Sequence, residues 1–268
     1  MFRRWAVVSV AVLLVTAVLI VGGGFVFRSR PGPRSVDSAL KNFRSSSTVA
    51  SDPSTFVRPA AGVYQVTGHG RETISTPSSS QDDSAVMPVT VQYLDRGCWQ
   101  WHIDYNTAHW HEYQFCPKDS QLLLTGQENF LSWDLGLLSV TNLGRYTCTP
   151  PAPVVVEHPT LGETFTHRCT GTNSAVAGPS VAVGPATVIG TDMLTIGGTR
   201  VEAIHQTRLQ TLTGAQSGTI HEEWWYDQAT GLPLKASRTY RLTTHSPVGE
   251  ITYTEQGSWQ LSSLHAQT

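Results

Sequence analysis

Two histidines, His109 and His111, are the residues of this chain whose type and spacing best suit chemistry. In a β-strand, side chains two positions apart point to the same face, so the two imidazoles would lie side by side. Such a pair binds zinc or copper when a third ligand comes from another strand. The sequence identifies no third ligand, and histidine pairs in sheets more often pack or hydrogen-bond. We therefore keep them as metal candidates only and predict no bound metal or other cofactor.

A second group of polar side chains lies in the C-terminal third. His205, Arg238 and Glu255 fall on or near the inward parity of three predicted strands. If the sheet encloses a cavity, they would form its polar end and hold a headgroup or carboxylate. Otherwise they lie at strand ends or pair with each other. With their aromatic neighbours, the candidate ligand-binding residues are His205, Trp224, Arg238, Tyr240, Tyr253 and Glu255.

Catalytic motifs are missing from the sequence. It contains no nucleophile elbow, phosphate-binding loop, dinucleotide-binding glycine set or His-Glu-x-x-His motif. Ser174 lacks the strand-to-helix setting that a serine hydrolase needs. We predict no catalytic residues and no enzyme, and a metal-dependent enzyme that uses His109 and His111 is the last alternative.

The cellular compartment of these residues depends on the apolar segment Trp5–Phe27, which has twenty-three residues and no charge. At about 1.5 Å of rise per residue, a helix of this length crosses a bilayer core of roughly 30 Å. A cleaved signal peptide would have a shorter apolar core and a small-x-small cleavage site. A retained single-pass signal-anchor is therefore favoured, with residues 1–28 as cytoplasmic tip and membrane helix.

The four cysteines, Cys98, Cys116, Cys148 and Cys169, all follow this segment. An even count behind a translocation signal predicts two disulfides in an oxidising compartment. A zinc site made by four thiolates is disfavoured because no C-x2-C pair occurs. The cysteines thus place the C-terminal domain outside the cytoplasm, at the cell membrane.

From Ser35 onward the chain has 13 basic and 20 acidic residues, a net charge of -7. An acidic external domain has no electrostatic basis for binding nucleic acid. The expected partners are instead the membrane, through the N-terminal helix, and either a lipid or other apolar small molecule or a protein of the cell envelope.

The remaining chain divides at residue 60. Residues 29–60 are rich in Pro and Ser and predict a flexible linker with a short amphipathic helix at 35–44. Residues 61–268 predict an antiparallel β domain with strands at 62–68 and 87–93 and a meander over 187–261. Residues 76–86 are expected to be a polar loop, and residues 171–186 a loop or a poorly specified strand.

The segment Cys98–Cys116 predicts a β-hairpin that folds back at residues 106–108. The cysteines then face each other, and Trp99, Trp101 and Ile103 share one inner face with the two histidines. The outer face is mostly polar. Because one register both opposes the cysteines and separates an aromatic from a polar face, we predict a Cys98–Cys116 disulfide. By elimination, Cys148 pairs with Cys169.

The stretch Glu223-Trp-Trp-Tyr-Asp-Gln-Ala-Thr-Gly-Leu-Pro-Leu-Lys235 resembles a hairpin of the LolA-like superfamily. That group covers periplasmic lipoprotein carriers, mycobacterial lipid-binding lipoproteins and the sigma-regulator RseB. The resemblance implies a curved antiparallel half-barrel around an apolar cavity that can hold acyl chains. The whole chain also resembles membrane-anchored exported proteins of actinobacteria that carry a Cys-Trp-x-Trp…Asn-Thr-Ala-x-Trp…Cys hairpin, and this second resemblance implies no particular activity.

The sequence therefore predicts an all-β, disulfide-stapled half-barrel outside the membrane, acting as a binding module of the cell envelope. A binder of an apolar or acyl ligand predicts a cavity lined by the meander. An interaction or scaffold domain predicts a filled core and an exposed apolar patch.

Overall fold

The structure, a computed structural model, describes residues 27–28, 30–46, 57–136, 138–156, 159–246 and 249–268. Apart from Phe27, the predicted membrane anchor lies outside the described residues. Within the described part of the chain, no helix is long and apolar enough to cross a membrane.

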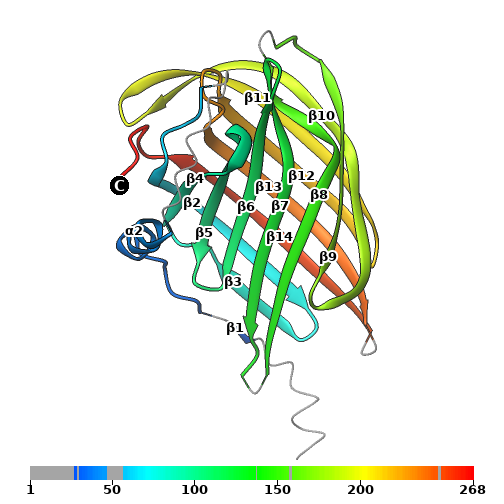
Figure 1. The fold of residues 1–268 in the computed structure, drawn as a ribbon. Helices are drawn as coiled ribbons and strands as arrows, with labels where there is room; N and C mark the ends of the chain where they lie inside the picture. The colour runs from blue at the N-terminus through cyan, green and yellow to red at the C-terminus, as the bar shows by residue number, and fades with distance from the viewer. Residues whose placement is uncertain (1–26, 29, 47–56, 137, 157–158, 247–248) are drawn as a thin grey trace, which may run out of the picture.

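Most of the described chain is β-strand (Figure 1). One α-helix, α2 (Val36–Ser45), and a short 3-10 turn, Asp95–Gly97, interrupt the strands. The strands are β1 (Phe27–Arg28), β2 (Gly62–Ser75), β3 (Ser78–Asp82), β4 (Val86–Tyr93), β5 (Trp99–Asn106), β6 (His109–Lys118), β7 (Gln121–Asp134), β8 (Ser139–Val155), β9 (Thr164–Asn173), β10 (Val176–Ile196), β11 (Thr199–Gly214), β12 (Gln216–Asp227), β13 (Pro233–Ser246) and β14 (Gly249–Leu261).

Twelve strands, β2 and β4 to β14, close into one antiparallel barrel. Strand β2 closes it, because residues 62–67 pair with β4 and residues 66–74 pair with β14. Strand β3 pairs with the second half of β2, and β1 lies parallel to β3. The all-β prediction is confirmed, whereas the half-barrel prediction is wrong. Periodicity reports which face a side chain takes, but not that the two ends of a sheet meet on one strand.

The segment 76–86, expected to be a loop, contains a strand, and the segment 171–186, expected to be a loop or a poorly specified strand, is largely strand. Residues 76–86 include β3, and residues 171–186 include the end of β9 and the first half of β10. Both segments consist largely of small and polar residues, which give little strand signal of their own. Their backbone groups form hydrogen bonds with neighbouring strands, and this pairing cannot be predicted from the residues of the segment alone.

The predicted hairpin and its disulfide are confirmed. Cys98 and Cys116 are bonded, and Trp99 lies opposite Phe115 in the predicted register. A bulge before the turn places Asn106, rather than Tyr105, opposite His109. The inner side chains are buried as predicted, including Trp99 and Trp101.

The second predicted disulfide, Cys148–Cys169, is also confirmed. Its cysteines lie directly opposite each other on β8 and β9. Strand β8 continues past the cysteine through the prolines at 150, 151 and 153, and its later part pairs only with β7. Proline is tolerated there because its missing N–H faces an edge without a ladder partner.

Large aromatic side chains fill one half of the barrel interior. Trp101 and Trp259 stack with ring centroids 5.5 Å apart, and Trp224 meets Trp259 edge-on at 5.8 Å. These rings belong to one continuous buried cluster that also contains Trp99 and Phe115. The filled half is a packed core rather than a binding space.

Helix α2 lies on the outside of the barrel. Ser35 caps its N-terminus by accepting a hydrogen bond from the Ser38 backbone N–H at 3.1 Å, as the predicted helix over 35–44 requires. Its apolar face, with Ala39 and Leu40, packs on Val63 of β2. Residues 30–46, which composition assigned to a flexible linker, are thus packed on the barrel.

Candidate functional site

The other half of the barrel interior holds a cavity of about 380 Å³. Turn residues between β2 and β3, between β7 and β8 and between β9 and β10 line it, so it reaches the barrel end that carries these turns, the lower end in Figure 1. Its wall is apolar. The wall includes Leu131, Trp133, Leu135, Val140, Leu212, Leu242 and Ile251.

The inner end of the cavity is polar. Where the cavity meets the aromatic core, the lining changes from aliphatic side chains to groups that ionise or hydrogen-bond. These floor residues are His111, Tyr113, Glu222, Tyr240, Tyr253 and Glu255. Tyr240, Tyr253 and Glu255 are among the residues expected to bind ligand, so parity along β13 and β14 placed them correctly.

The two histidines on β6 meet at this floor. Their Nε2 atoms lie 3.1 Å apart and share a hydrogen bond. The Nδ1 of His109 lies 2.6 Å from a carboxylate oxygen of Glu72, and the Nδ1 of His111 lies 3.2 Å from the Tyr113 hydroxyl. Both imidazoles are therefore held in place through Nδ1, with their Nε2 atoms turned toward each other.

A buried ion pair lies beside the histidines. Arg238 on β13 donates hydrogen bonds to Glu255 on β14 and, at 2.7 Å, to Asp83. The second oxygen of Glu255 accepts a hydrogen bond of 2.7 Å from the Tyr253 hydroxyl. The alternative that the polar residues pair with one another thus holds for Arg238 and Glu255, and the same carboxylate also lines the cavity.

A second ion pair crosses the floor from β11 to β12. Arg208 lies 3.4 Å from Glu222, which also accepts hydrogen bonds from the Tyr240 hydroxyl and from the Trp224 indole N–H at 3.0 Å. Arg208 in turn donates to the Tyr226 hydroxyl. Sequence reasoning missed Arg208 and Glu222, although each lies an even number of positions from a buried neighbour on its strand.

Burial and neighbouring charge shift the ionisation of these groups in opposite directions. Burial disfavours the charged form of His109, but the carboxylates of Glu72 and Glu255 outweigh it and raise its pKa. Burial, together with the charge of His109, holds the pKa of His111 well below its ordinary value. Burial would raise the pKa of Glu255, but Arg238, with smaller contributions from His109 and His111, outweighs burial and lowers it to about 2. The floor therefore presents an ionised carboxylate beside a neutral imidazole.

Three of the six expected ligand-binding residues, Arg238, His205 and Trp224, do not line the cavity. His205 is on the outer face of β11, where it stacks on Trp225 at 4.1 Å and lies 3.4 Å from Asp192. Trp224 is buried in the aromatic core behind the floor. Glu72 and Asp83, which complete the polar cluster, were missed. Asp83 lies in the segment 76–86 that was predicted to be a polar loop, and Glu72 lies beyond the end of the predicted strand 62–68.

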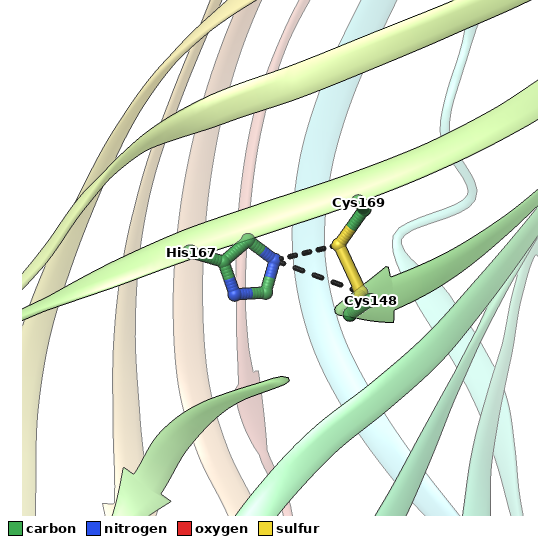
Figure 2. Close-up of side chains that lie close together, drawn as sticks. All are labelled: Cys148, His167 and Cys169. Atoms are coloured by element: carbon green, nitrogen blue, oxygen red, sulfur yellow. Dashed lines mark hydrogen bonds between the residues drawn. A yellow bond between two sulfur atoms is a disulfide. The ribbon is translucent and has the colours of Figure 1, made fainter. Parts of the chain in front are cut away.

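A further histidine packs against the second disulfide, as Figure 2 shows. The Nε2 of His167 lies 2.9 Å from Cys169 Sγ and 3.9 Å from Cys148 Sγ. Burial, with a smaller contribution from the charge of Arg208, lowers the pKa of His167 to about 3. The three residues resemble a metal-ligand set, but both sulfurs are consumed in the disulfide and neither is a thiolate, so the group is structural.

Comparison with known proteins leaves the family open. No family model and no curated protein sequence matches the chain. Among solved structures, the fold is similar to the hypothetical lipoprotein YmcC from Escherichia coli K12, at a TM-score of 0.36 and 13% identity over 71% of this chain and 83% of that one.

Proposed function

We propose that the barrel is an extracytoplasmic binding module that holds an amphipathic ligand, an apolar chain with one polar head, in its open cavity. The observation that carries the proposal is the cavity of about 380 Å³ with an aliphatic wall and a polar floor. Its volume falls in the range of about 300–1,000 Å³ found for small-molecule sites. An acyl chain matches the wall, and a hydroxyl or protonated carboxyl head, which can donate a hydrogen bond to the floor carboxylates, matches the floor.

The floor would select for the head group. Glu222, Tyr240 and Tyr253 offer hydrogen-bonding groups toward the cavity. These groups are hydrogen-bonded within the floor, Tyr240 to Glu222 and Tyr253 to Glu255, and their oxygens keep further acceptor lone pairs that a donor on a ligand head can use. A ligand with a polar head would gain these hydrogen bonds, and for this reason we favour an amphipathic ligand over a plain hydrocarbon.

The mouth of the cavity lies close to the predicted anchor. Strand β1, Phe27–Arg28, pairs with Ser79 and Ser80 of β3, next to the turn residues Thr76 and Pro77 that line the cavity. Since the predicted membrane segment ends at Phe27, this end of the barrel would face the bilayer. A ligand drawn from the membrane is then more accessible than one drawn from solution.

The resemblance of the 223–235 hairpin to LolA-like carriers supports the same ligand class, although this barrel is closed. A scaffold domain of the cell envelope is the alternative function. It predicts a filled interior, and the described residues instead leave half of the barrel unfilled.

The test is lipid binding by the full-length protein purified in detergent. Native mass spectrometry should detect an extractable ligand, or uptake of one equivalent of a C16 fatty acid. Leu212→Trp fills the cavity from β11 and should weaken uptake at least tenfold. Thr211→Trp is the matched control, because the neighbouring side chain on the same strand points outward. Equal uptake by both variants, or none by the wild type, would overturn the proposal.

A further inference from the structure

We infer that His109, His111 and Glu255 form a binding site for a divalent transition metal at the floor of the cavity. The two imidazole nitrogens come from one strand, β6. The carboxylate comes from β14, which is separated from β6 in the barrel by β5, β4 and β2. This inference does not depend on the proposed lipid ligand, since it concerns only what the floor residues can coordinate.

The spacing of the ligand atoms fits a metal. The two Nε2 atoms are 3.1 Å apart, and one oxygen of Glu255 lies with them in a group whose atoms are all within 4.8 Å of one another. Bonds of about 2.0–2.1 Å in a tetrahedral zinc site place ligand atoms about 3.3 Å apart. The histidines already meet this spacing, and the carboxylate needs to approach by at most about 1.5 Å.

The surrounding contacts are those of a metal site. Ligating histidines commonly hold their second nitrogen against a carboxylate or another polar group, which fixes the ring and raises its basicity. Glu72 takes this position on His109 at 2.6 Å, and the Tyr113 hydroxyl takes it on His111 at 3.2 Å. The two Nε2 atoms therefore converge because each ring is held at its Nδ1 atom.

The charge of the cluster gives an independent reason. Glu72, Asp83 and Glu255 contribute three carboxylates, Arg238 contributes the one guanidinium that pairs with them, and all four side chains are 5% exposed or less. Carboxylates thus outnumber the guanidinium by three to one in this cluster. A divalent cation bound to the two histidines would offset that excess of buried negative charge, which a proton on the histidines offsets only in part.

Two histidines and one carboxylate are a ligand set used for zinc and for ferrous iron, with coordination positions left open. His111 and Glu255 both line the cavity, so an open position would face it. If the cavity holds an amphipathic ligand as proposed, its carboxylate or hydroxyl head could coordinate the metal directly.

The experiment uses the full-length protein in detergent, stripped with a chelator and reloaded with Zn²⁺ alone. Elemental analysis and calorimetry should find one equivalent bound, and Co²⁺ in its place should give the visible absorption of a low-coordinate site with nitrogen and oxygen ligands. His111→Gln and Glu255→Gln should each weaken Zn²⁺ binding at least tenfold. Circular dichroism and thiol counting establish that each variant is folded with both disulfides formed.

Two control variants locate the metal. His102→Gln removes the neighbouring histidine on the outer face of the same hairpin and should leave Zn²⁺ binding unchanged. His167→Gln removes the histidine beside the Cys148–Cys169 disulfide and should also leave it unchanged. The inference is overturned if the wild type takes up no stoichiometric Zn²⁺, or if His167→Gln or His102→Gln loses the metal while folded His111→Gln retains it. Fatty acid uptake by metal-free protein reports separately on the proposed lipid function.

Discussion

Gly70 on β2 and Gly257 on β14 lie directly opposite each other, and the space left by their missing side chains holds the buried Asp83–Arg238 ion pair. A Cβ atom on Gly70 would come within 2.0 Å of Asp83 Oδ2, and one on Gly257 within 2.8 Å of Arg238 Nη1. The glycines are therefore needed for room rather than for backbone conformation.

This relationship predicts that Gly70→Ala and Gly257→Ala each lower the free energy of unfolding by about 1–3 kcal/mol, the usual cost of inserting a methyl group into a packed interior. Thermal unfolding of the full-length protein in detergent measures the change. Gly32→Ala is the control, because a Cβ there meets no atom within 4 Å, and it should stay within about 0.5 kcal/mol of wild type. Equal stability of all three variants would show that the ion pair moves aside freely.

The aromatic core predicts that truncating a tryptophan on the inner face of the disulfide hairpin destabilises the protein more than truncating one on the outer face. Trp101 is fully buried and stacks on Trp259, so Trp101→Ala should cost about 3–5 kcal/mol in denaturant unfolding. Trp110, on the outer face of the same hairpin, stacks on Phe130 and keeps part of its surface exposed. Trp110→Ala should cost less than half as much, and the reverse order would mean that the faces are exchanged.

The contrast between these tryptophans shows what the sequence could predict. Alternation along one hairpin and the spacing of its cysteines were sufficient for register, faces and both disulfides, because all of these are local properties. The same parity placed Arg238, Tyr240 and Glu255 in the interior. It failed for His205, because the inward positions of β11 are Ile204, Gln206 and Arg208, and His205 lies on the opposite parity.

The remaining parts of the site depend on contacts between distant segments. Glu72 and Asp83 lie in polar stretches whose burial follows only from barrel closure through β2. Arg208 and Glu222 are charged residues, which a pattern-based reading assigns to the outer surface unless a partner is known. Each becomes acceptable in the interior because the other lies beside it. The buried ion pairs are therefore the part of this fold that could not be predicted from a single sequence.

The first disulfide predicts a specific chemical outcome. Cys98→Ser should leave Cys116 as the only alkylatable thiol, because the other bridge, Cys148–Cys169, joins different strands. Loss of the bridge should cost about 3 kcal/mol, as expected for a closed loop of this size. Peptide mapping after alkylation identifies the free thiol. Modification of Cys148 or Cys169 in the variant would show that the bridges exchange.

The outer face of the hairpin predicts that stability falls as pH rises above neutrality. His102 lies 3.3 Å from Glu112 and 3.5 Å from Asp104. Burial disfavours its charged form, but these two carboxylates outweigh burial and raise its pKa to about 9. An unfolded histidine titrates near 6.5. The folded state therefore binds the proton more tightly, and the stabilisation is complete below about pH 6.5 and is lost as pH rises through 9.

His102→Gln should remove this dependence. The free energy of unfolding of wild type minus that of the variant should be about 1–3 kcal/mol at pH 6 and should shrink toward zero by about pH 9.5. His245→Gln, at an exposed position on the β13–β14 hairpin, should stay within about 0.5 kcal/mol of wild type across the same range. A difference between wild type and His102→Gln that stays constant with pH would mean that His102 stabilises the hairpin through packing against Trp110, whose ring lies 4.9 Å away, and not through its charge.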